Sequence, residues 1–164
     1  MAKKATNPTK DLYRQLRSLS WEQLWQEEVP RFNQAGAEER VNRVALIRAI
    51  GAGFTEARTP ALQEPARQWL LSLLQDPSEK IRRYAMNALP KIGAGQSEEK
   101  QLLHLLQKSD GEREKKYLGQ ALNKIGGSAT LDLLRTRSDL LPHLTLWITC
   151  KLLCPSCLLP ALLA

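Results

Sequence analysis

One segment of this chain occurs twice in closely related form, 33 residues apart. Residues 83–93 read RYAMNALPKIG, and residues 116–126 read KYLGQALNKIG. A weaker echo at 44–53, VALIRAIGAG, ends in the same Ile-Gly-Ala-Gly as residues 92–95. Repeats of this length are typical of stacked helical hairpins, because one hairpin alone cannot bury its apolar face. The repeat therefore restricts the chain to a small group of helical architectures.

The composition agrees with that restriction. The 164 residues are 43% hydrophobic and 25% charged, which is enough to bury a continuous core in one domain or one solenoid. Leu and Ala dominate while β-branched and aromatic residues are scarce, a balance that favours helix over strand. We predict an all-α fold: an α-solenoid of about four stacked antiparallel helical hairpins.

Capping and turn residues predict where the helices begin and end. Ser20 and Gln23 form a capping box, and Ser97 with two glutamates in the first turn opens a later helix. Glycines 51 and 53 are expected to stop one helix, and glycines 93 and 126 to stop two others. The predicted helices span 9–18, a short helix after Ser20, 38–50, a helix from Pro60 or Pro65 to 75, 79–92, 98–108, 112–125, 128–136, and a last one from near 139.

The predicted organisation has four parts. Residues 1–8 form a flexible basic lead, 9–37 form amino-terminal capping helices, and 38–137 form the repeats. Residues 138–164 form an apolar terminal helix and a tail rich in Cys, Pro and Leu. A terminal repeat needs a polar outer face, so this tail is anomalous. Three explanations of the tail stay open: it docks on a partner, it is the end of a shortened chain, or it is an aberrant ending.

The segment from Asp76 to Gly93 resembles the HEAT-like repeat family of the phycobilisome-lyase type. It has an Asp-Pro turn, then Ile81-Arg82, then alanines that lead to Ile92-Gly93. The resemblance covers roughly 38–137 and implies a solenoid. The following repeat departs from the pattern, because Asp110-Gly111 replaces Asp-Pro and Glu114-Lys115 replaces the aliphatic-Arg pair. Proteins with such repeats include scaffolds, adaptors, bilin lyases and DNA-repair proteins, so the resemblance implies no single activity.

The clearest candidate site is a repeated polar row. Positions i, i+4 and i+8 of each copy carry a cation, an amide and a cation, on the side of the helix away from its apolar face. Such a row suits phosphates or carboxylates, and the alternative is a solvated face that recurs because the unit was duplicated. The older echo has Val41, Ala45 and Ala49 at these positions, so the row does not continue there. The six candidate partner-binding residues are Arg83, Asn87, Lys91, Lys116, Gln120 and Lys124.

Other chemistry-bearing residues suggest no catalytic or metal site. Cys150, Cys154 and Cys157 have the C-x3-C-x2-C spacing of iron–sulfur enzymes, but no βα pattern surrounds them and three thiolates do not close a zinc site. We expect idle or buried cysteines, no metal and no cofactor. His104, inside a leucine-rich helix, is expected to be a tolerated residue at the boundary of the core rather than a base or ligand, and the four tryptophans are expected in the core rather than stacked on bases. No phosphate-binding glycine loop or nucleophile elbow is present.

We therefore expect a non-catalytic binding module or scaffold that recognises an acidic protein or a nucleic acid through a basic helix face. The formal net charge of +7 suits such a partner. Two alternatives stay open: an accessory or subunit of a HEAT-like phycobilin lyase system, and the DNA- or RNA-binding domain of a modification or repair enzyme. The odd cysteine number and the polar first ten residues predict a cytoplasmic protein with no membrane partner. The oligomeric state is left open.

Overall fold

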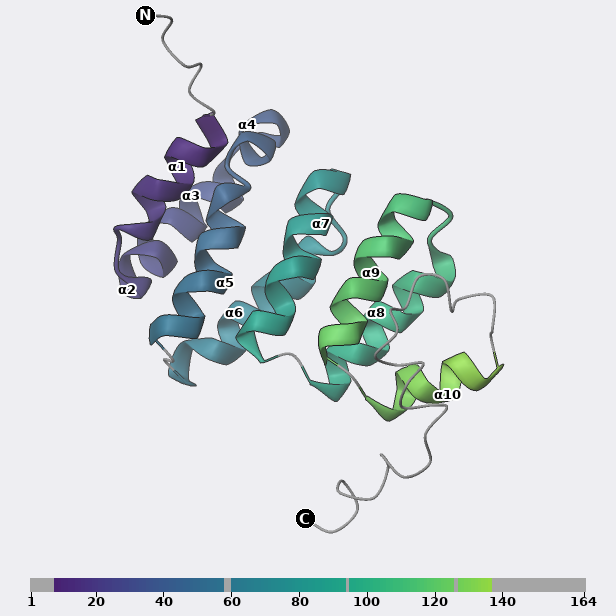
Figure 1. The fold of residues 1–164 in the computed structure, drawn as a ribbon. Helices are drawn as coiled ribbons and strands as arrows, with labels where there is room; N and C mark the ends of the chain where they lie inside the picture. Colours follow the sequence, from purple (N-terminus) through teal and green to yellow (C-terminus); the bar gives the residue numbers. More distant parts are fainter. Residues whose placement is uncertain (1–7, 58–59, 94, 126, 137–164) are drawn as a thin grey trace, which may run out of the picture. The chain divides into compact units, whose positions relative to one another are not determined.

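The computed structural model describes residues 8–57, 60–93, 95–125 and 127–136. These residues form helices and connecting turns, with no strand among them (Figure 1). The predicted all-α class is therefore confirmed for the described residues. The chain divides into two compact units, Met1–Gly93 and Ala94–Ala164, so a boundary falls inside the span predicted for the repeats.

Unit 1 consists of one layer of helices with a second layer behind it. Helices α1, α5 and α7 lie side by side in the first layer, and α6 and the segment α2–α3 pack behind them (Figure 1). Its elements are α1 (Pro8–Arg17), α2 (Trp21–Gln23), the π-helical turn η1 (Leu24–Glu28), α3 (Val29–Gln34), α4 (Ala37–Asn42), α5 (Ala45–Ala57), α6 (Pro60–Leu73), α7 (Glu79–Ala88) and the 3-10 turn η2 (Leu89–Ile92).

The entry to α2 follows the local sequence signal. The Ser20 hydroxyl accepts a hydrogen bond from the backbone N–H of Gln23 at 3.2 Å, and the Gln23 side chain accepts one from the backbone N–H of Ser20 at 3.0 Å. The predicted capping box is confirmed. Such reciprocal bonds satisfy two backbone donors that a helix start leaves without partners.

Helix α5 runs through Gly51 and Gly53, and the predicted stop at these glycines is wrong. A Cβ on Gly51 would lie 3.2 Å from the Cβ of Ala88 in α7, and one on Gly53 would lie 3.4 Å from the ring of Trp21. The glycines therefore let neighbouring elements approach closely. A glycine inside a helix costs about 1 kcal/mol relative to alanine, and we attribute its tolerance here to this packing. The predicted helix at 38–50 is also divided, because α4 ends at Asn42 and α5 begins at Ala45.

The helix predicted at 79–92 is α7 followed by the 3-10 turn η2, and this segment ends as predicted at Gly93. Pro90 lies in this turn and has no backbone N–H to continue the α-helical pattern. Gly93 then adopts a left-handed conformation with φ of 81°, which favours glycine. The side-chain amide of Gln63 donates to the carbonyl of Ile92 at 2.8 Å and ties α6 to this end.

The core of unit 1 contains a cluster of aromatic rings. Trp69 contacts Phe32 and Trp25 edge-on at centroid distances of 5.8 and 6.1 Å, and Trp25 stacks on Trp21 at 6.4 Å. Trp21 and Trp69 are buried, which confirms the core prediction for these two. Trp25 is half-buried, and Trp147 lies outside the described residues.

Unit 2 contains α8 (Gln96–Lys108), α9 (Glu112–Ile125) and α10 (Ser128–Thr136), with α9 and α10 both packed on α8. The bounds of α9 and α10 agree with the sequence prediction. Helix α8 starts two residues earlier than predicted from Ser97, because Gly95 is its N-cap and the Glu98 carboxylate accepts from the Gly95 N–H at 2.7 Å. The buried apolar residues of unit 2 are Leu102, Leu103, Leu106, Leu118, Ala121 and Leu122.

Among the described helices, none combines the length and the apolar character needed to cross a membrane. Pro8, predicted as the end of the flexible lead, is the first residue of α1. The rest of the predicted lead, the helix predicted from near 139 and the apolar tail lie outside the described residues.

Candidate functional site

The first predicted row lies along α7 and η2. Arg83 and Asn87 are half-buried and Lys91 is exposed, while Ile81 and Ala85 on the other side of the helix are buried. The helix is thus amphipathic with the row on its accessible side. All three residues of this row are at least partly accessible, and Lys91 lies in the turn η2 that follows α7.

Local contacts orient this row. The Asn87 side-chain amide donates to the backbone carbonyl of Arg83 at 3.0 Å, and the Arg83 guanidinium carbon lies 5.9 Å from the ring centroid of Tyr84. The Lys91 Cδ atom lies 3.5 Å from the position that a Cβ on Gly51 would occupy. The aliphatic part of the Lys91 side chain therefore packs against α5, although Lys91 as a whole is exposed to solvent.

The second predicted row lies along α9. Lys116 and Lys124 are exposed and Gln120 is half-buried, whereas Leu118 and Leu122 are fully buried. This copy repeats the cation–amide–cation order on the accessible side of an amphipathic helix. The two rows belong to different compact units, so each is a separate surface feature.

Helix α5 carries a cation that the repeat alignment missed. Ala45 and Ala49, at the row positions of the older echo, are buried, so the row is absent there as expected. Arg48 is exposed, and its guanidinium carbon lies 4.1 Å from the ring centroid of Tyr13 in α1. Arg48 is the one charged residue in the sequence between positions 44 and 54. A single charged residue in an apolar helix could have marked Arg48 as exposed from the sequence. Its aromatic partner could not be predicted, because Tyr13 lies on a distant segment of the chain.

Two arginines near the Asp-Pro turn have structural contacts. The Asp76 carboxylate accepts from the Ser78 backbone N–H at 2.8 Å and pairs with Arg40 at 2.6 Å. Arg82 donates to the carbonyls of Asp76 and Pro77 at 2.9 and 3.1 Å. The Asp-Pro and aliphatic-Arg elements that carry the family resemblance thus organise this turn.

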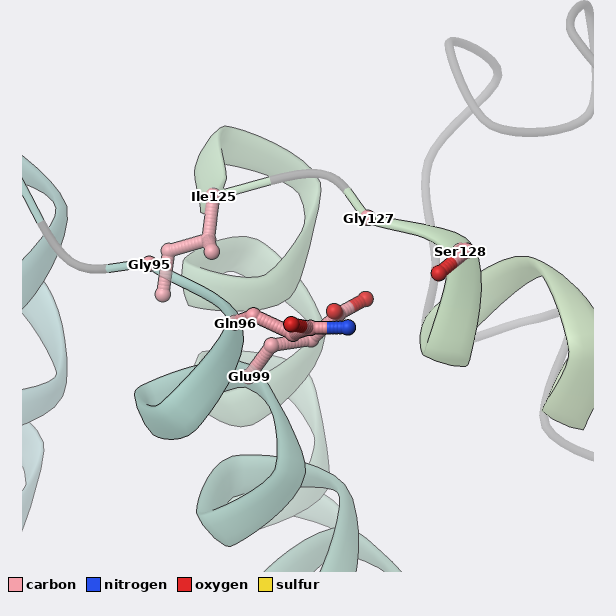
Figure 2. Close-up of a pocket in the computed structure, with 6 residues that line it drawn as sticks. All are labelled: Gly95, Gln96, Glu99, Ile125, Gly127 and Ser128. Atoms are coloured by element: carbon pink, nitrogen blue, oxygen red, sulfur yellow. The ribbon is translucent and has the colours of Figure 1, made fainter.

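A cavity of about 240 Å³ opens at the start of α8 and α10 in unit 2 (Figure 2). The Glu99 carboxylate lines it and is 1% exposed as a residue. One oxygen of Glu99 accepts from the Thr130 backbone N–H at 2.8 Å and from the Thr130 hydroxyl at 2.5 Å. The other lining residues are Gly95, Gln96, Ile125, Gly127 and Ser128.

This cavity is a helix-capping site. The N-terminus of a helix attracts an anion because its first N–H groups lack partners, and Glu99 supplies that anion to α10. Gly127 makes room for it, because a Cβ there would lie 2.5 Å from the Glu99 Cδ atom. Glu99 therefore serves the fold of unit 2, and the cavity adds no ligand site to the two rows.

In the described part of the chain, no group of three or more His, Cys, Asp or Glu side chains is placed to hold a metal ion. His104 is exposed on α8, farther from the core than the predicted boundary position. Cys150, Cys154 and Cys157 lie outside the described residues, so the prediction about them stays a prediction. Comparisons with models of protein families, with curated proteins and with solved structures found no match to this chain.

Proposed function

We propose that this chain is a non-catalytic HEAT-like repeat module that binds an acidic macromolecular partner through its basic helix faces. One observation supports this most directly. Both copies of the repeated helix keep a cation, an amide and a cation on the accessible side, although each copy buries its own apolar side. The proposal includes the stacked-hairpin solenoid that the sequence repeat predicts.

The row geometry suits a linear anionic ligand. In the α-helix α9, residues eight apart are separated by about 12 Å along the axis, with the amide halfway between. In the first row Lys91 lies in the 3-10 turn η2, where the rise is about 2.0 Å per residue. Exposed ion pairs contribute about 0.2–1 kcal/mol each, so two rows of two cations give modest binding that weakens with salt. The amides add hydrogen-bonding capacity toward carboxylate or phosphate oxygens.

The test is charge reversal in both rows. The Arg83→Glu/Lys116→Glu variant changes the net charge by four units, and so does the control Lys100→Glu/Lys108→Glu, which alters two exposed cations of α8. The probes are a labelled polyglutamate chain and a labelled DNA duplex, each titrated over a salt series. We expect the row variant to weaken binding at least tenfold more than the control, with unchanged helicity by circular dichroism.

Equal binding by the row variant and the control would overturn the proposal. The two probes also separate the partner classes. Duplex binding through phosphates predicts a logarithmic salt slope of about −0.9 for each contact, and loss of two contacts would reduce the slope accordingly.

A further inference from the structure

The first layer of unit 1 joins helices from three distant segments. Arg48 of α5 contacts the ring of Tyr13 in α1, and Gly51 of α5 faces Ala88 and the stem of Lys91. Toward the same end of α5, an Arg17 nitrogen of α1 lies 3.9 Å from the position of a Cβ on Gly53. Helices α1, α5 and α7 therefore pack in register, with α5 in the middle (Figure 1).

The side of this layer away from α6 carries a basic surface. The apolar residues of α5 between Ala45 and Ile50 are buried and Arg48 alone in that stretch is exposed, which places it on the outer side. The accessible row residues of the neighbouring segment are Arg83 on α7 and Lys91 in the turn η2 that follows it. We call Arg48, Arg83 and Lys91, with the Tyr13 ring beneath Arg48, the α5–α7 basic surface.

The contact with the Tyr13 ring holds the Arg48 guanidinium in a defined position on the surface. A guanidinium over an aromatic ring is held by cation–π attraction, worth about 0.5–1 kcal/mol at an exposed site. Arg48 is also exposed as a residue, so its guanidinium can meet an oxygen pair from solvent. A planar guanidinium matches a carboxylate or a phosphate with two parallel hydrogen bonds, which a lysine ammonium cannot do.

Two observations favour a carboxylate partner over nucleic acid. Residues 8–93 contain 13 Lys and Arg against 10 Asp and Glu, a net charge of +3, which is low for a surface that tracks a phosphate backbone. Single-stranded nucleic acid needs exposed rings for base stacking. None of the described tryptophans is fully exposed, Tyr13 and Tyr84 are half-buried, and the Tyr13 ring lies beneath Arg48. Discrete guanidinium groups on a weakly charged surface suit a short acidic peptide.

We infer that the α5–α7 basic surface binds an extended peptide segment rich in Asp and Glu, with Arg48 as its central carboxylate-binding residue. This inference rests on the proposed function, because it names the partner class and extends the α7 row onto α5. Packed helix axes lie about 8–10 Å apart, and an extended peptide rises about 3.3 Å per residue. About three residues of the peptide thus match the distance between two neighbouring helix axes.

The experiment uses the full chain and a labelled hexaglutamate peptide, with hexaglutamine and a DNA duplex as comparison probes. We expect Arg48→Ala to weaken hexaglutamate binding about five- to tenfold, and Arg48→Lys to recover less than half of that loss. Tyr13→Leu, which keeps an apolar side chain but removes the ring, should weaken binding about two- to threefold. The Arg48 Nε–Hε resonance should shift on titration with hexaglutamate and stay in place with hexaglutamine.

The outcomes distinguish this inference from the proposed function. If Arg48→Ala binds hexaglutamate as well as the unmodified chain while Arg83→Glu/Lys116→Glu does not, the Arg48 assignment fails and the module remains a binder. If hexaglutamate binds no better than hexaglutamine while the duplex binds tightly through the rows, the peptide assignment is wrong and the partner is nucleic acid. If both row and Arg48 variants bind both anionic probes normally, both proposals fail.

Discussion

The two compact units satisfy their buried carboxylates in different ways. In unit 1, Asp76 pairs with Arg40, and Glu28 accepts from Arg31 at 3.0 Å and pairs with Arg43. In unit 2, Glu99 is bonded to the backbone N–H and the hydroxyl of one residue at the start of α10. The first arrangement joins full charges, and the second joins a carboxylate to neutral donors and to the partial positive charge of a helix end.

The difference predicts different responses to mutation. Removal of one member of a buried ion pair leaves an uncompensated charge in a medium that solvates it poorly. Replacement of a capping carboxylate by an amide keeps one acceptor oxygen and loses a smaller electrostatic contribution. The stability of unit 1 should therefore fall most when a charged side chain is removed. The stability of unit 2 should fall most when a new side chain displaces the Glu99 carboxylate or when its acceptor oxygens are removed.

The largest effect is expected from Arg40→Met in unit 1. The Asp76 side chain is 3% exposed, and the substitution leaves its charge with the Ser78 N–H as its remaining described partner. We expect a loss of about 3 kcal/mol in the free energy of unfolding of unit 1. Urea unfolding of the full chain measures it, and amide exchange in α6 and α7 assigns it to this unit.

Arg31→Met is the matched control for that variant. The Arg31 side chain is 63% exposed, and its partner Glu28 keeps Arg43. Its effect should stay within about 0.5 kcal/mol. Similar losses for the two variants would show that burial of the partner does not govern the cost.

The next largest effect is expected from Gly127→Ala in unit 2. The new Cβ would displace the Glu99 carboxylate from Thr130, so the amides of α10 should exchange faster and unit 2 should lose about 2 kcal/mol. Gly111→Ala is the control, because its Cβ would meet nothing closer than 3.9 Å. In a double-mutant cycle, Glu99→Ala should absorb most of the Gly127→Ala cost, and additive losses would contradict this contact.

The smallest effect is expected from Glu99→Gln. The amide oxygen can still accept from Thr130, so we expect a loss of about 0.5–1 kcal/mol. The corresponding Asp76→Asn change in unit 1 should cost about 2 kcal/mol, because Arg40 loses its anionic partner. Chemical denaturation with amide exchange resolves the two units, and the reverse order would refute the distinction between them.

Local signals in the sequence predicted much of the fold. The capping box at Ser20 and Gln23, the end at Gly93 and the bounds of α9 and α10 all depend on residues close together in the chain. The amphipathic pattern also predicted which sides of α7 and α9 are accessible. These features are set by backbone geometry and by neighbouring side chains, which a sequence displays directly.

Features that depend on distant partners were predicted less well. Gly51 and Gly53 gave the signal of a helix stop, yet they are contact points for α7 and Trp21. Glu99 was expected to stabilise the start of its own helix, but it caps α10. Arg48 was absent from the candidate site because its partner, Tyr13, lies 35 positions earlier in the chain.

The repeated helix has some features that the local sequence sets and others that tertiary packing sets. The sequence by itself determined that α7 and α9 are helices with one apolar side and one cationic side, because helical periodicity is local. Tertiary structure alone decided that Lys91 rests on Gly51 and that Arg48 lies over Tyr13. Such contacts depend on how separate helices pack, and packing is set by the combined shapes of segments far apart in the chain.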